Sequence, residues 1–255
     1  MNNIYDQGFF KVFLSHDSNK ETKKYTDDLK EELHFFGISC FVAHNNIYPG
    51  QEWEKKINLA LCQMDGFIAL LTNTFHGNIW TDQELGFAVC KKVPIIPVAF
   101  ENINPKGFIA KLQSVVYDSK EVSTKIAQTF IKDCKMIDPY LSAVKECQSY
   151  NVANKLSQLL SSIEILSEYQ KEGLFFAFNN NIEINQSYGF KGEYGWNNGK
   201  SLAYELNRLS SESQFAYQMY KEISPKLSRL VKVQKNQNIV QQNLAPPTTY
   251  NNNYY

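Results

Sequence analysis

The segment IWTDQELGFA, at residues 79 to 88, holds two side chains whose spacing could serve chemistry, Trp80 and Glu84. Residues four apart lie on the same face of a helix, so an aromatic ring would stand next to a carboxylate. Such a pair can stack a planar ring and hold a sugar hydroxyl. A structural interpretation competes with this one, because Thr81 to Glu84 fits the S/T-x-x-E capping box of a helix start. On local rules alone, capping is the better explanation.

The elements around this segment predict an α/β fold. From Phe9 onward, short apolar runs alternate with helical patterns, which is typical of βαβ units and of a parallel sheet covered on both faces. The predicted strands are FFKVFLS, ISCFVA, DGFIALLT, VPIIPVAF and SVVYDS, and EVSTKIAQTFIKDCKM is a closing helix. Ligands of such sheets bind outside the carboxyl ends of the strands. The loops to search therefore follow Leu14, Val42, Leu71 and Val98.

Two of these loops carry further candidate residues. Ser15 and His16 follow the first predicted strand, where they could be ordinary loop residues or could bind a ligand. The loop after the second strand contains His44, Asn45, Asn46, Ile47, Tyr48, Pro49 and Gly50. Pro49 and Gly50 fix a turn, but an apolar pair at a loop tip, Ile47 and Tyr48, indicates contact with another chain or with a ligand.

The α/β rhythm ends after Pro139. Residues 140 to 172 and 201 to 232 show helical periodicity, whereas LFFAF and IEINQSY, around Asn179 to Asn181, predict a hairpin. The tail is rich in Asn and Gln and too polar to build a core. We therefore expect an α/β domain at residues 1–135, a smaller, mainly helical domain at 136–232 and a disordered tail at 233–255.

Composition excludes several classes of function. The 26 basic and 26 acidic residues balance, so the charge favours neither nucleic acid nor an anionic membrane as a partner. The five cysteines form no C-x-x-C pair for a metal, and we expect them to be buried, reduced thiols.

No secretory leader or membrane-spanning run is evident. GWNNGKS, at 195 to 201, lacks the first glycine of a phosphate loop. We expect a cytoplasmic protein with no metal site.

Read in order, KVFLSH, GISCFVAHNNIYPGQEW, MDGFIALLT, WTDQELGFA and VPIIPVAF resemble the TIR domain, particularly its bacterial branch, over roughly residues 9 to 134. The resemblance implies a flavodoxin-like fold of five parallel strands. It matches His44 to Gly50 with the BB loop, through which these domains self-associate. It also matches Glu84 with the glutamate that enzymatic members need to cleave NAD+, and it places Ser15, His16, the BB loop and Trp80 among the NAD+-contacting residues.

NAD+ would then be the substrate, with no cofactor. Breaking the bond between nicotinamide and ribose gives ADP-ribose if water attacks, or a cyclic ADP-ribose isomer if a group of the same molecule attacks. The setting implied is anti-phage defence of the Thoeris type, in which the product activates a separate effector protein. The alternative is a non-enzymatic adaptor, or an effector that mimics host TIR domains.

A helix cap and a catalytic carboxylate would compete for the same oxygens. We therefore predict that Glu84 points into the cleft and that, if either residue caps the helix, Thr81 does so alone.

Overall fold

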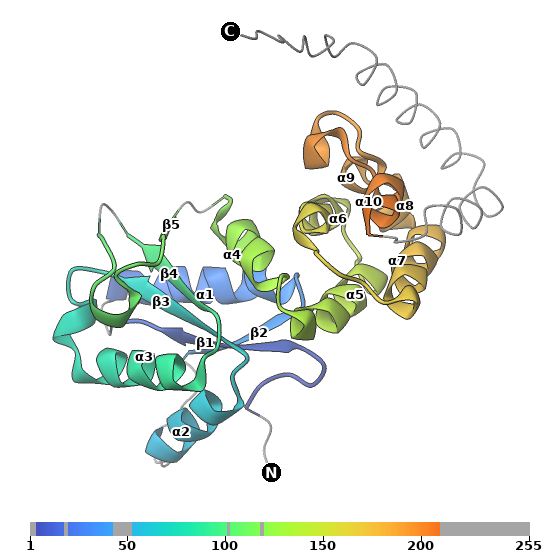
Figure 1. Ribbon diagram of the computed structural model, residues 1–255. Helices are drawn as coiled ribbons and strands as arrows, with labels where there is room; N and C mark the ends of the chain where they lie inside the picture. The colour runs from blue at the N-terminus through green and yellow to red at the C-terminus, as the bar shows by residue number, and fades with distance from the viewer. Residues whose placement is uncertain (1–3, 18–19, 43–52, 101–102, 118–119, 210–255) are drawn as a thin grey trace, which may run out of the picture.

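The computed structural model describes residues 4–17, 20–42, 53–100, 103–117 and 120–209 (Figure 1). Its centre is a parallel sheet with the strand order β2-β1-β3-β4-β5. The strands are β1 (Phe10–Ser15), β2 (Ile38–Val42), β3 (Gly66–Leu71), β4 (Ile95–Ala99) and β5 (Val115–Val116). The predicted five-stranded parallel sheet is confirmed.

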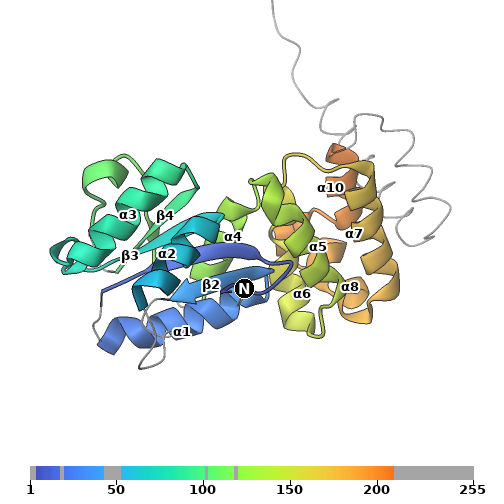
Figure 2. The same ribbon diagram turned by 90° about the horizontal axis from the view of Figure 1, so that it is seen from below.

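Helices cover both faces of the sheet (Figures 1 and 2). The helices α1 (Lys20–His34) and α4 (Val122–Phe130) pack on one face, and α2 (Trp53–Gln63) and α3 (Ile79–Lys91) pack on the other. Every residue of β2 and β3 is buried, as expected for continuous apolar runs in a doubly covered sheet.

The strand order places a topological switch point between β1 and β3. The chain leaves β1 toward β2 on one side and then continues from β3 on the other side. In open α/β sheets the crevice at such a point, outside the carboxyl ends of the strands, is where ligands bind. The loops after Ser15 and Leu71 therefore meet at the favoured position for a site.

The second part of the chain is helical. It contains α5 (Ile137–Lys145), α6 (Tyr150–Ser157), α7 (Glu168–Asn180), α8 (Ile182–Gln186), α9 (Tyr188–Lys191) and α10 (Leu202–Arg208). The 3-10 turns η3 (Cys134–Met136), η4 (Leu160–Ser162) and η5 (Trp196–Gly199) also belong to it, whereas η1 (Phe75–Gly77) and η2 (Gly107–Ile109) lie in the α/β part. The apolar core is continuous from the α1 and α4 face of the sheet into these helices.

The predicted hairpin around Asn179 to Asn181 is wrong. LFFAF lies in α7, where Ser167 and Gln170 form a capping box, and Leu174 and Phe178 are buried one turn apart. Asn181 caps α8 by accepting hydrogen bonds from the next turn's backbone. A short apolar run has no period of its own, and here the caps on both sides determine its conformation.

The cysteine prediction holds only in part. All five cysteines are free thiols, but only Cys40 and Cys147 are buried, so the prediction of buried thiols is wrong for Cys62, Cys90 and Cys134. Within the described ranges, no helix is both long and apolar enough to span a bilayer, and no group of His, Cys, Asp and Glu suits a metal ion. The domain boundary at 135 stays a prediction, and the tail at 233–255 lies outside the described residues.

Candidate active site

Ser15 and Glu84 meet at the carboxyl end of β1. Ser15 is the last residue of β1, and Glu84 lies in the second turn of α3, which packs against β1 and β3. Ser15 Oγ donates a hydrogen bond to Glu84 Oε2 at 2.5 Å, and both side chains are buried. The fold thus brings together two sequence-predicted site residues that are far apart in the chain.

The environment of Glu84 disfavours its charged form. Burial raises the pKa of the Glu84 carboxyl from its ordinary value of 4.5 to about 7, while the hydrogen bond from Ser15 acts in the opposite direction. Among the described residues, Ser15 is the only hydrogen-bond donor to this carboxylate. The second oxygen, Oε1, accepts no hydrogen bond from the described residues.

Asp17 holds the loops of the site together. Its buried carboxylate accepts hydrogen bonds from Thr72 Oγ1 at 2.6 Å and from Thr74 Oγ1, both in the loop after β3. It also accepts from Thr22 Oγ1 of α1, at 3.0 Å. The loop after β1 is thereby fixed to the loop after β3 and to α1. Sequence reasoning did not single out Asp17, although its place after a strand was a usable signal.

His16 lies inside this network. Its ring is buried, with Nδ1 against the backbone carbonyl of Asp17 and 3.4 Å from Thr22 Oγ1. His16 directly follows Ser15 in the sequence. Its Nδ1 atom faces the loop after β1.

The start of α3 differs from the sequence prediction. Asn78 is the N-cap and accepts a hydrogen bond from Trp80 N at 3.0 Å, whereas Thr81 Oγ1 donates to the carbonyls of Phe75 and Asn78. The capping-box interpretation of Thr81 to Glu84 is therefore wrong, and Thr81 does not supply the cap either. Asn78 supplies the cap one residue before the helix begins, which leaves the Glu84 carboxylate to Ser15.

Comparison with known proteins identifies the segment that carries this site. Residues 12–129 match the family model described as the TIR domain. These residues are a TIR domain. A solved structure of the TIR domain of a Toll-related receptor from the lower metazoan Hydra magnipapillata is 18% identical, covers 49% of this chain and 97% of that chain, and has a TM-score of 0.40. A search of curated proteins gave no match.

Trp80 and Asp82, both in the first turn of α3, have different surroundings. Trp80 lies one turn before Glu84 on α3, and its side chain is 42% exposed. Asp82 contacts His76 of η1, with 2.8 Å between Oδ1 and Nδ1. Trp80 is thus partly exposed one turn from Glu84, whereas Asp82 is engaged with His76.

The remaining predicted ligand contacts lie in the BB loop. His44, Asn45, Asn46, Ile47 and Tyr48 fall outside the described residues of the TIR domain. Their roles stay predictions.

Proposed function

We propose that the TIR domain cleaves NAD+ between nicotinamide and ribose, and that Glu84 is the catalytic residue. The observation that carries the proposal is the buried Glu84 carboxylate at the switch point of the sheet, held by Ser15 and by no cation within the described residues. A buried carboxylate without a positive partner weakens the fold. Perturbed groups of this kind concentrate at functional sites.

The chemistry needs one carboxylate. When the bond between the ribose C1′ and the nicotinamide nitrogen breaks, its electron pair goes to the nitrogen, and nicotinamide leaves as a neutral molecule. Positive charge develops on the ribose as an oxocarbenium ion. An ordinary glycosidase needs a second carboxyl group to protonate its leaving oxygen, and this reaction does not. Glu84 would stabilise the cation, and losing such a preorganised group costs roughly 10²- to 10³-fold in rate.

The neighbouring residues have supporting roles in this proposal. Ser15 orients the Glu84 carboxylate and favours its charged form. Trp80 would stack on the ring system of NAD+ and limit the access of water. NAD+ is consumed as the substrate, so no cofactor is needed.

The fate of the cation determines the product. Attack by water, with loss of a proton, gives ADP-ribose. Attack by the adenine or by a ribose hydroxyl of the same molecule gives a cyclic ADP-ribose isomer. We place this activity in bacterial anti-phage defence in the cytoplasm, where a separate effector protein would respond to the product.

The alternative is a non-enzymatic module that acts through contacts between TIR domains. One observation favours it: α3 exposes the apolar side chains of Ile79 and Phe87, which are 72% and 38% exposed. Apolar side chains exposed on one helix can form part of a surface for association. TIR domains self-associate in general, so this surface also suits an enzyme that acts when assembled.

The test is chromatography of a reaction mixture of the purified full chain with NAD+, at high protein concentration and with a crowding agent. We expect loss of NAD+ together with equal amounts of nicotinamide and of ADP-ribose or a cyclic isomer. Intact NAD+, combined with stable binding to a TIR domain, would instead support the adaptor.

A further inference from the structure

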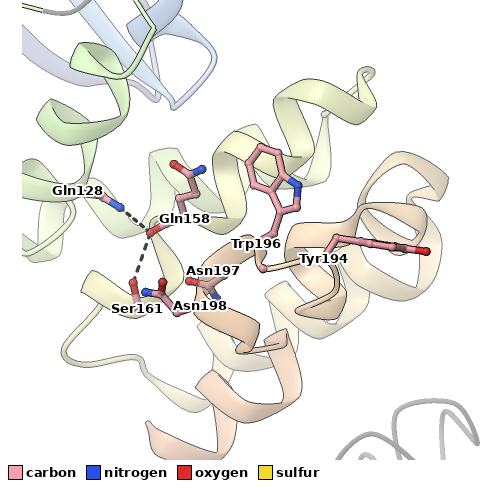
Figure 3. Close-up of a pocket in the computed structure, with 8 residues that line it drawn as sticks. Gln128, Gln158, Ser161, Tyr194, Trp196, Asn197 and Asn198 are labelled. Atoms are coloured by element: carbon pink, nitrogen blue, oxygen red, sulfur yellow. Dashed lines mark hydrogen bonds between the residues drawn. The ribbon is translucent and has the colours of Figure 1, made fainter.

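A cavity lined by residues far in sequence from Glu84 lies where the TIR domain meets the helical region. It has a volume of about 390 Å³ (Figure 3). We call it the junction pocket and define it by the residues that line it, which are Gln128, Gln158, Ser161, Tyr194, Gly195, Trp196, Asn197 and Asn198. A volume in this range accommodates a small ligand.

The lining of the junction pocket is polar, aromatic and uncharged. Four amide side chains, two hydroxyl groups and an indole contribute to it, without Lys, Arg, Asp or Glu. An amide offers donors and an acceptor together, which matches neighbouring hydroxyl groups that both donate and accept. A phosphate or carboxylate would find no cationic side chain among these residues.

Trp196 provides a flat apolar surface next to these amides. In Figure 3 the Trp196 ring and the Gln158 amide project in the same direction, whereas the Tyr194 ring extends away from them. Tyr194 packs edge-on against Tyr188 of α9, with ring centroids 4.4 Å apart. The combination of an aromatic face and a neighbouring amide suits a ligand that has one apolar ring face and a polar edge.

The loop that forms one wall has an unusual backbone. Three of the four non-glycine residues with positive φ in the described chain are Tyr194, Asn197 and Asn198, at 52°, 49° and 53°. Such conformations cost free energy and concentrate at functional sites. The bond from Asn197 Nδ2 to the Lys200 carbonyl, at 2.7 Å, holds the turn closed. The wall is therefore preformed.

The junction pocket joins two parts of the chain. Gln128 belongs to α4, inside the matched TIR segment, whereas the other lining residues belong to the helical region. Gln128 Nε2 donates a hydrogen bond to the backbone carbonyl of Gln158 at 3.0 Å. The TIR domain and the helical region are therefore hydrogen-bonded to each other beside the pocket. A ligand here would contact both.

We propose that the junction pocket binds a neutral, polyhydroxylated ring compound, a free saccharide or a nucleoside, between the TIR domain and the helical region. The aromatic face of Trp196 stacks on the sugar or base, and the amides of Gln158 and Asn198 bind its hydroxyl groups. This site is independent of the proposed NAD+ cleavage, because it shares no residue with the site at Glu84.

The test is ¹⁹F NMR of the full chain labelled with 5-fluorotryptophan. The chain has three tryptophans, so three resonances are expected and can be assigned with single Trp-to-Phe variants. The probes are maltose, N-acetylglucosamine, adenosine and uridine, with AMP as the anionic comparator of adenosine. We expect at least one neutral probe to shift the Trp196 resonance saturably, with a Kd below about 10 mM. A response to sugars alone or to nucleosides alone identifies the source.

Two variants and a matched control test the residues. Gln158→Ala removes the amide but keeps the carbonyl that Gln128 bonds, and Asn198→Gly keeps the positive φ without strain. Each should weaken binding about tenfold or more, the scale of a lost hydrogen bond to a polar ligand. Gln113→Ala, at an exposed glutamine outside the pocket, should leave the Kd unchanged.

Three outcomes would overturn the proposal. They are the absence of a saturable Trp196 shift with all four neutral probes, a shift that both pocket variants retain in full, and tighter binding of AMP than of adenosine at this resonance. A shift confined to Trp80 would report the NAD+ site and would count against the junction pocket.

Discussion

At the scale of single residues, Glu84 combines burial with a hydrogen bond from Ser15, and these act on its ionisation in opposite directions. Its pKa of about 7 lies where small changes of pH alter its charge. In the proposed reaction only the carboxylate form stabilises the ribose cation. The same burial that makes the charge effective also makes it unfavourable in the free protein.

The pH dependence of turnover follows from this. We expect kcat/KM for NAD+ to fall about tenfold per pH unit on the acid side of the Glu84 pKa, which is about 7. The limb for kcat should lie at lower pH, because the positive nicotinamide ring of bound NAD+ favours the carboxylate. Initial rates across pH measure both limbs.

Ser15→Ala tests the origin of that limb. The variant removes the hydrogen bond that favours the charged form, so the acid limb of kcat/KM should move to higher pH. An unchanged limb in Ser15→Ala would show that the limb does not report Glu84.

Stability should respond to Glu84 in the opposite sense from activity. The folded pKa, about 7, exceeds the ordinary 4.5, so the stability that the neutral carboxyl contributes is present below pH 4.5 and is lost as pH rises through 7. Glu84→Gln, which can still accept from Ser15, avoids this loss. Above the folded pKa the variant should be more stable by on the order of 3 kcal/mol, with no gain below the unfolded pKa.

Urea denaturation of wild type and Glu84→Gln at several pH values measures this difference. A variant that is less stable than wild type at alkaline pH would contradict the burial of an ionisable Glu84.

At the scale of elements, Asp17 fixes the loops that carry the site. Three threonine hydroxyls donate to its carboxylate from α1 and from the loop after β3. Asp17→Asn replaces one acceptor oxygen with a donor, so buried hydroxyls lose their partner. We expect the free energy of unfolding to fall by roughly 2 to 3 kcal/mol.

Asp82→Asn is the control for that experiment. Asp82 is a half-exposed carboxylate paired with His76, so its loss should cost about 1 kcal/mol or less. Chemical denaturation of both variants gives the comparison, and equal losses would mean that the Asp17 network does not hold the loops.

The elements also show what could be predicted from the sequence. Alternating apolar runs and helical patterns predict the sheet correctly, since doubly covered strands are apolar throughout. The run LFFAF misleads because a short apolar run suits a strand or a buried helix, and only the caps at Ser167 and Asn181 decide. The capping-box pattern at the start of α3 also misleads. Asn78 is the N-cap, and Glu84 is hydrogen-bonded to Ser15, at a strand end that is distant in sequence.

The site residues also divide into those that the sequence predicts and those that it does not. Ser15 and Glu84 follow from strand ends and from the family resemblance. The Asp17 network does not, because it depends on Thr72 and Thr74 being brought across the sheet from another loop. Local sequence patterns carry no information about such distant partners.

At the scale of the whole molecule, the helical region shares its core with the sheet. Gly37, before β2, marks a close approach of the two parts. A Cβ atom on Gly37 would lie 2.5 Å from the backbone oxygen of Pro139 in α5. The contact leaves no room for a side chain.

Gly37→Ala tests this contact, and Gly8→Ala is its matched control. Both glycines have φ of +83°, but nothing lies within 4 Å of a Cβ on Gly8. Gly8→Ala should cost about 1 kcal/mol for its backbone conformation, and Gly37→Ala should cost about 1 to 3 kcal/mol more for the clash. Thermal unfolding of both variants measures the difference, and equal costs would contradict tight packing between the two parts.

The central claim is that the Glu84 carboxylate carries out NAD+ cleavage, and the most direct measurement is the rate of nicotinamide release by the full chain and by Glu84→Gln. We predict release by wild type and by the control Asp82→Asn, and a rate lower by roughly 10²-fold or more in Glu84→Gln, with the variant still folded. Equal rates in wild type and Glu84→Gln would contradict the claim.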